Sequence, residues 1–240
     1  MKKFAVALAT TALVSGAALA DAKKFDGPFI GAQIGIAQSD GKFEVQDRSV
    51  NSLNQVQGGD LSTKGVVGGI HLGWDKVFQN KWLLGLEVYG DLSSLNGKAS
   101  LSQTNTAGFG GSNKVDMDWS IGVNVRGGVI ISDTLAYLSL GWVGSDWEIR
   151  QTDNRPGSDN RNAKKDKFKS GFRVGLGMAT MLNDNLMLGV EAAYSWYDDI
   201  KVSRTDADPI IADRETLISK YDPEVLEAKL KLSWKIRGIS

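Results

Sequence analysis

Apolar and polar side chains alternate without a break along residues 226–236, near the end of the chain. Successive side chains of a β-strand point to opposite faces, so this segment predicts a strand with one wholly apolar face and one face that carries charges of both signs. The same division recurs along seven earlier segments, whose polar sides hold glycines and opposite charges. The pattern is typical of transmembrane barrel strands, which meet lipid on one side and a polar lumen on the other.

The segments with this pattern predict strands at about 28–38, 64–74, 81–92, 115–130, 135–147, 167–180, 186–199 and 226–236. On the fourth segment we expect Val115 and Met117 to face lipid and Asp116 and Asp118 to face the lumen. The fifth segment is the least regular, and its expected outward residues are Leu138, Leu140 and Trp142. None of the outward positions is charged, although charged residues make up 23% of the chain. Because a basic side chain at the lipid midplane costs about 2–4 kcal/mol, this absence favours a membrane barrel.

The connections between these segments alternate in length. Short turns are expected at 75–80, 131–134 and 182–185, and long polar loops near 39–63, 93–114, 148–166 and 200–223. An eight-stranded barrel has four long outer loops and three short turns when both chain ends lie on the periplasmic side. The sequence therefore predicts an all-β fold, an eight-stranded antiparallel up-and-down transmembrane β-barrel with its long loops outside.

Tryptophan placement gives an independent indication of the same topology. The tryptophans near the short turns are Trp74, Trp82 and Trp234, and those near the long loops are Trp119, Trp147 and Trp196. Aromatic girdles belong at these two membrane interfaces. Trp142 does not fit this arrangement, and a general preference of strands for aromatic residues is the alternative explanation.

The first 20 residues have the features of a secretory signal peptide. Two lysines follow Met1, residues 4–14 are apolar, and residues 18–20 (Ala-Leu-Ala) fit the small-x-small cleavage pattern. The apolar run is shorter than the roughly 20 residues that a membrane-spanning helix needs. We therefore expect cleavage of residues 1–20 and a mature barrel domain at 21–240, exported to the outer membrane.

Composition narrows the chemistry and the partners. The chain has no cysteine, which excludes disulfides, zinc-thiolate sites and thiol catalysis. Of its 28 basic residues, two lie in the signal peptide, so 26 stand against 28 acidic residues in the mature domain. This balance gives no reason to expect a nucleic-acid partner.

An eight-stranded barrel has an interior just wide enough to be filled by side chains. The inward residues expected to form a charge network are Glu87, Asp91, Asp118, Arg126, Arg173, Glu191, Lys229 and Lys231. Buried charges persist when they are paired and hydrogen-bonded, so we expect a plug of ion pairs. A narrow ion-conducting path is the alternative, although a barrel of this size lacks the wide water channel of larger porins.

The sequence offers little that points to catalysis. His71 is the only histidine, and a lone inward imidazole is expected to be a structural hydrogen-bonding group. No nucleophile, base and orienting acid stand out as a triad, and Glu87 and Glu191 are expected to pair with arginine rather than to act together as a carboxylate pair. We therefore expect no enzyme activity, no cofactor and no metal site.

Two loops carry charge-biased patches. Residues 150–167 are rich in arginine and lysine, which suits lipopolysaccharide phosphates. Residues 198–215 are rich in aspartate, which suits a divalent cation, although their spacing matches no calcium loop. Solvated loop surface is the simpler explanation of both patches.

Several stretches carry a family resemblance. Residues 168–177 (FKSGFRVGLG), 182–186 (LNDNL) and 189–194 (GVEAAY) resemble the closing hairpin of small OmpA-like, opacity-type outer-membrane barrel proteins. Residues 82–87 (WLLGLE) resemble the third strand of that family, and 135–141 (LAYLSLG) its fifth. The resemblance implies a surface-exposed barrel of the Gram-negative envelope with a structural, adhesive or host-contact role, and in some members haem binding.

Together these features predict a non-catalytic structural or surface-interaction protein of the outer membrane. A narrow pore or small-ligand barrel is the second hypothesis, and a lipid-modifying enzyme is the third. The expected partners are outer-membrane lipid and lipopolysaccharide, the barrel-assembly machinery, and host or envelope surface molecules.

Overall fold

The computed structural model of the chain describes residues 22–48, 56–100, 111–153, 163–207 and 214–237, and the expected signal peptide lies outside them. A short 3₁₀ helix, η1 (Ala22–Phe25), precedes the strands β1 (Gly27–Arg48), β2 (Val56–Phe78), β3 (Trp82–Ser100), β4 (Gly111–Ile131), β5 (Thr134–Asp153), β6 (Ala163–Met181), β7 (Leu186–Tyr197), β8 (Ile200–Ala207) and β9 (Arg214–Lys235). In the described part of the chain, no helix is long and apolar enough to cross a membrane.

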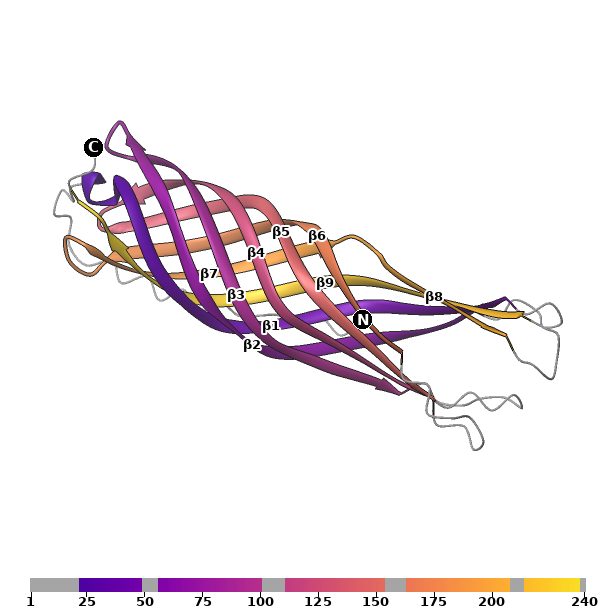
Figure 1. Cartoon of the computed structure of the whole chain (residues 1–240). Helices are drawn as coiled ribbons and strands as arrows, with labels where there is room; N and C mark the ends of the chain where they lie inside the picture. The colour runs from indigo at the N-terminus through magenta and orange to yellow at the C-terminus, as the bar shows by residue number, and fades with distance from the viewer. Residues whose placement is uncertain (1–21, 49–55, 101–110, 154–162, 208–213, 238–240) are drawn as a thin grey trace.

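Antiparallel pairing closes the sheet into a barrel (Figure 1). Each strand from β1 to β7 pairs with the next, β7 pairs with β9, and β9 returns to β1. β7 and β8 pair with successive parts of β9, so they form one long strand that is interrupted at Asp198 and Asp199. The predicted eight-stranded up-and-down barrel is confirmed.

Strands continue beyond the barrel into stretches that were expected to be loops. β1 pairs with β2 as far as the Gln46–Val56 pair. In contrast, β2 pairs with β3 only as far as Lys64 and Asn96, and β6 pairs with β7 only from Gly171. The wall therefore divides on the long-loop side into two four-stranded sheets, β8-β9-β1-β2 and β3-β4-β5-β6, which extend to the right in Figure 1.

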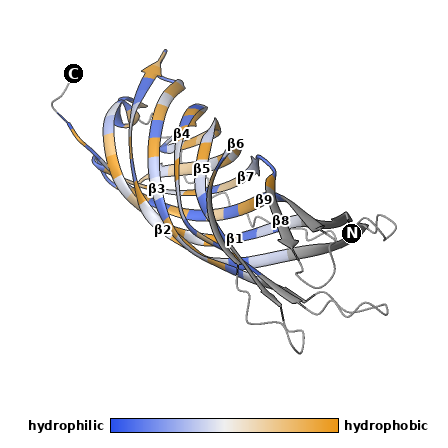
Figure 2. Ribbon diagram, turned by 45° about the vertical axis from the view of Figure 1, so that its right-hand side comes forward, coloured by the Kyte–Doolittle hydropathy of each residue, from blue (hydrophilic) through white to orange (hydrophobic). Residues whose placement is uncertain are grey.

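The barrel wall is apolar outside and polar inside. Hydrophobic and hydrophilic residues alternate along the strands in Figure 2. Large apolar side chains such as Ile34, Leu86 and Leu230 are about half exposed on the outer face. An apolar surface of this extent marks contact with a membrane, because soluble proteins rarely expose contiguous apolar patches larger than a few hundred Å².

A β-bulge in β4 changes the expected facings near the long-loop end. Asp118 is the extra residue, since Met117 and Trp119 pair with consecutive residues of β5. One inserted residue exchanges the two faces of a strand. Val115 and Met117 are therefore buried inside the barrel, whereas Asp118 is exposed outside. The predictions that Val115 and Met117 face lipid and that Asp118 faces the lumen are wrong.

Aromatic residues lie on the outer face at both ends of the barrel. Five of the six tryptophans placed there by the sequence are exposed, namely Trp74, Trp82, Trp119, Trp196 and Trp234. Trp142 also belongs to the long-loop girdle, because it pairs with Phe172, whose ring stacks on Trp196 at a centroid distance of 6.4 Å. The prediction that Trp147 belongs to this girdle is wrong. Its side chain is buried inside the barrel, and its ring lies edge-on to that of Tyr197. Its position in β5 is an odd number of residues from Trp142, which places it on the opposite face.

Two apolar clusters lie inside the barrel. The cluster at the short-turn end consists of Ala22, Phe25, Leu83, Ile130, Leu135, Tyr137, Ala179, Met181 and Met187. The cluster at the long-loop end consists of Ala37, Val67, Leu95, Val115, Met117, Trp147, Ile200 and Val225. We call them the turn-end layer and the loop-end layer. The charged residues of the interior lie between them.

Candidate functional site

Ten buried charged side chains fill the middle of the barrel. The acids are Asp75, Glu87, Asp91, Glu191 and Glu227, and the bases are Arg126, Arg173, Lys229, Lys231 and Lys235. We call these ten residues the charge network. They come from β2, β3, β4, β6, β7 and β9, where period-two alternation turns them inward. With five charges of each sign, the network is neutral when every member is ionised.

The half of the network near the short turns centres on Asp75. Arg126 binds this carboxylate in a bidentate manner, through Nε at 2.8 Å and Nη2 at 2.5 Å. Lys235 donates to the same carboxylate at 2.7 Å and also to the main-chain carbonyl of Phe25. Arg126 reaches on to Glu87 through Nη1 at 3.3 Å. The N-terminal segment is thereby attached to the interior charges.

The central contacts continue the alternation of sign. Lys231 lies between Glu87 and Glu191, with its Nζ at 2.5 and 3.6 Å from their carboxylate oxygens. Arg173 lies between Glu191 and Glu227, with Nη2 at 2.9 and 3.2 Å from their oxygens. Each of these bases touches two acids, which offsets the cost of removing its charge from water.

The network ends on the side of the long loops at Asp91. Lys229 joins Glu227 to Asp91, with distances of 3.1 and 2.6 Å from Nζ to the carboxylate oxygens. The amide of Gln33 donates to the second oxygen of Asp91 at 2.7 Å. The ten charges thus form one continuous line from Lys235 to Asp91 in which acid and base alternate.

Aromatic rings pack against the guanidinium groups. The Arg126 guanidinium lies 4.3 Å from the ring centroid of Phe29, and that of Arg173 lies 4.9 Å from Tyr89. Tyr137 lies near Arg126 and donates its hydroxyl hydrogen to Glu191 at 2.9 Å. Such cation–π contacts strengthen when water is excluded.

Two inward glycines make room for these rings. A Cβ atom added at Gly122 would lie 2.4 Å from the Tyr89 ring, and one added at Gly177 would lie 2.3 Å from the Tyr137 ring. Real Cβ atoms do not approach other atoms so closely. A larger residue at either position would force the tyrosine ring to shift.

Seven of the eight residues predicted for the interior lie in the network, and Asp118 does not. The network residues that the sequence prediction missed are Asp75, Glu227 and Lys235. Asp75 was assigned to a turn, although it continues the alternation His71, Gly73 by one further step. Glu227 and Lys235 share the polar face of the strand that contains Lys229 and Lys231, so the same alternation was the available signal.

His71 and Ser233 resemble two members of a catalytic triad. His71 Nε2 lies 2.8 Å from the hydroxyl of Ser233, and both residues are buried. Nδ1 of His71 has no hydrogen-bond partner in the described structure, so no acid orients the ring. The pair lies on the inner face of the barrel wall. The expectation of a structural role for His71 stays a prediction.

The described residues contain no group of three or more His, Asp or Glu side chains that could hold a metal ion. The side chains of the basic patch at 150–167 and most of those of the acidic patch at 198–215 lie outside the described residues.

The comparisons with known proteins agree with the barrel. The family model for the outer membrane protein beta-barrel domain matches residues 6–208. OprG from Pseudomonas aeruginosa has a similar structure, with 16% identity, a TM-score of 0.52, and coverage of 88% of this chain and 97% of OprG. The outer membrane protease OmpT from Escherichia coli has 9% identity, a TM-score of 0.52, and the same coverage of both chains.

Ail, the attachment invasion locus protein of Yersinia pestis, is 13% identical, with a TM-score of 0.34 and coverage of 84% of this chain and 99% of Ail. None of the curated proteins compared with the chain matches it. At these identities, the similarity to solved structures shows the fold alone. One of these structures is a protease, so the fold does not distinguish an enzyme from a non-enzyme. The family model covers most of the sequence, so the chain belongs to the outer-membrane β-barrel protein family and is a protein of the outer membrane.

Proposed function

We propose that this protein is a closed, non-catalytic barrel that acts at the cell surface through the strands and loops outside the membrane. The charge network carries the proposal, because it fills the middle of the lumen between two apolar layers. A side-chain-filled barrel offers neither a water path nor a substrate cavity. The membrane-spanning part then serves as an anchor.

The two four-stranded sheets beyond the barrel support a role in surface contact. Strands β1, β2 and β9 each have 22 or 23 residues, whereas about 9–11 are enough to cross the membrane. The extra length extends the sheets beyond the lipid on the long-loop side. Host or envelope surface molecules and lipopolysaccharide are the partners that this arrangement suits, and the barrel-assembly machinery is the partner expected for insertion.

Single-channel recording tests whether the barrel is closed. The purified full chain in a planar lipid bilayer should give no stable, discrete openings at moderate voltage. Regular openings of defined size would contradict a closed barrel and would favour the narrow pore. The interior of the barrel and not its loops should block the current. A variant with shortened loops should therefore also show no openings.

A shortened hairpin tests the surface role. Removing residues 42–60 and joining Gly41 to Leu61 by a short turn leaves the β1–β2 pairing within the barrel intact. Bacteria that display this variant should attach to cultured epithelial cells more weakly than bacteria that display the full chain, at equal surface amounts. Equal attachment would argue for a purely structural protein.

Lipid analysis tests the absence of catalysis. Expression of the full chain should leave the acylation pattern of lipopolysaccharide unchanged, and His71→Ala should have no effect on that pattern. A new acyl species that disappears in His71→Ala would replace the proposal with a lipid-modifying enzyme.

A further inference from the structure

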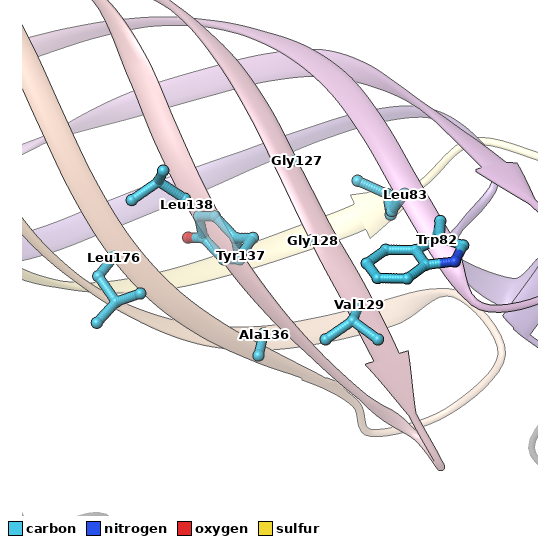
Figure 3. A pocket seen from close by; sticks show the side chains of 9 residues that line it. All are labelled: Trp82, Leu83, Gly127, Gly128, Val129, Ala136, Tyr137, Leu138 and Leu176. Atoms are coloured by element: carbon cyan, nitrogen blue, oxygen red, sulfur yellow. The ribbon is translucent and has the colours of Figure 1, made fainter.

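A groove on the outer surface lies near the short turns and has a volume of about 480 Å³. Trp82 and Val129 lie at one end of it, Leu138 and Leu176 lie at the other, and Tyr137 lies between them (Figure 3). Its lining is almost wholly apolar, and its residues come from β3, β4, β5 and β6. Trp82, Leu138 and Leu176 are about half exposed on the outer face, so the groove opens toward the hydrocarbon of the membrane.

Small residues at outward positions create the groove. Gly127 lies between Leu84 of β3 and Leu138 of β5, and Ala136 lies beside Val129 in the adjacent row. A Cβ atom added at Gly127 would meet no atom closer than 4.0 Å. Packing within the protein therefore leaves this space open, whereas each inward glycine considered above is required by a neighbouring ring. The space is available to a molecule from outside the barrel.

A cation lies beside the end of the groove that Trp82 lines. Lys81 is exposed in the turn before β3, and its carbonyl accepts a hydrogen bond from the backbone of Ile130 at 2.7 Å. Its Nζ lies 5.7 Å from the ring centroid of Trp82, which lines the groove. The short turns lie on the periplasmic side of such barrels. Lys81 is thus at the height of lipid head groups, next to an apolar groove.

We propose that the groove binds a phospholipid of the periplasmic leaflet, with one acyl chain between Trp82 and Leu176 and the phosphate at Lys81. The apolar lining and the adjacent cation complement the two parts of one lipid molecule. Basic residues beside a hydrophobic surface recognise anionic lipid head groups in the same way. This site is independent of the surface role proposed above.

Native mass spectrometry of the full chain with added phosphatidylglycerol tests the proposal. Wild-type protein should retain one lipid at detergent concentrations that strip the remaining lipids. Gly127→Leu fills the groove and should abolish this retention. Gly90→Leu is the matched control, because a Cβ atom at this outward glycine also meets nothing within 4 Å, yet Gly90 does not line the groove.

Lys81→Gln should weaken retention of the same lipid by about two- to fivefold, which corresponds to one exposed ion pair. Lys76→Gln removes a different exposed lysine at the same end of the barrel and should leave retention unchanged. A heat-modifiability gel confirms that each variant folds, and Ala136→Leu replaces Gly127→Leu if the latter fails. Equal retention by wild type and the groove-filled variant, equal loss in Gly90→Leu, or retention of lipopolysaccharide instead would overturn the proposal.

Discussion

At the scale of single residues, what each side chain does depends on which side of the wall it lies. Leu230 is about half exposed and pairs with Ile34 and Val190, both also on the outer face of the barrel. Its neighbour Lys231 is buried between two carboxylates. Two adjacent residues of the strand therefore face hydrocarbon and the charge network, respectively. Only the position of Lys231 tolerates a charge.

Leu230→Arg should lower the free energy of unfolding by about 2–4 kcal/mol, because it places a basic group in the hydrocarbon. Urea titration of the protein folded in lipid vesicles measures this difference. Leu230→Ala is the control for loss of the leucine itself and should cost less. Equal stability of Leu230→Arg and the wild type would mean that the outward assignment of β9 is incorrect.

Arg126 is the residue whose loss should disturb the network most, since it binds Asp75 through two nitrogens and Glu87 through a third. Arg126→Met should cost about 3–5 kcal/mol, because removing one member of a buried pair leaves uncompensated charge. In the same urea titration, adding Glu87→Gln restores neutrality, so the double variant should lose less than the sum of the single losses. Strictly additive losses would indicate that these charges do not interact.

At the scale of elements, alternation in the sequence was enough to predict the barrel strands and their order. The alternation predicted the wrong facing where the strand pairing is irregular. The bulge at Asp118 depends on the register between β4 and β5, and the sequence of one strand does not contain this register. It also failed beyond the membrane, because both faces of a strand can be polar there and the apolar period ends before the strand does. The continuation of β1 to Arg48 was consequently assigned to a loop.

The 3₁₀ helix η1 is an element that the sequence did not reveal. Its Phe25 is buried in the turn-end layer, Lys24 lies 3.0 Å from Asp184, and Asp26 lies 3.1 Å from Lys76. Four residues are too few to produce a periodic signal. The helix closes the short-turn end of the lumen because one aromatic side chain inserts into it.

Phe25→Ala should release η1 without unfolding the barrel. Trypsin should then cleave after Lys23 or Lys24 several times faster than in the wild type, while the heat-modifiable band of the folded barrel persists. Phe78→Ala, which removes an exposed aromatic residue at the same end, serves as the control. Unchanged cleavage in Phe25→Ala would show that the ion pairs alone hold the segment in place.

At the scale of the whole molecule, the described interior has three barriers in series: the turn-end layer, the charge network and the loop-end layer. An ion that crosses the barrel must pass all three, so the most resistant barrier sets the conductance. Each barrier is made from different residues, and the two outer barriers are apolar whereas the middle one is charged. A substitution that weakens one of them leaves the other two in place.

This arrangement predicts that conductance appears only when several barriers are removed together. Trp147→Ala opens the loop-end layer, Phe25→Ala opens the turn-end layer, and Arg173→Gln with Glu227→Gln weakens the network without changing its net charge. Each change alone should give no conductance in planar bilayers, because an apolar constriction or a row of paired charges still blocks water.

The combination of all four substitutions should give small, discrete openings. If Trp147→Ala alone conducts, the network is not a barrier and the loop-end layer is the gate. If the combined variant is folded yet silent, side chains outside these three groups close the lumen.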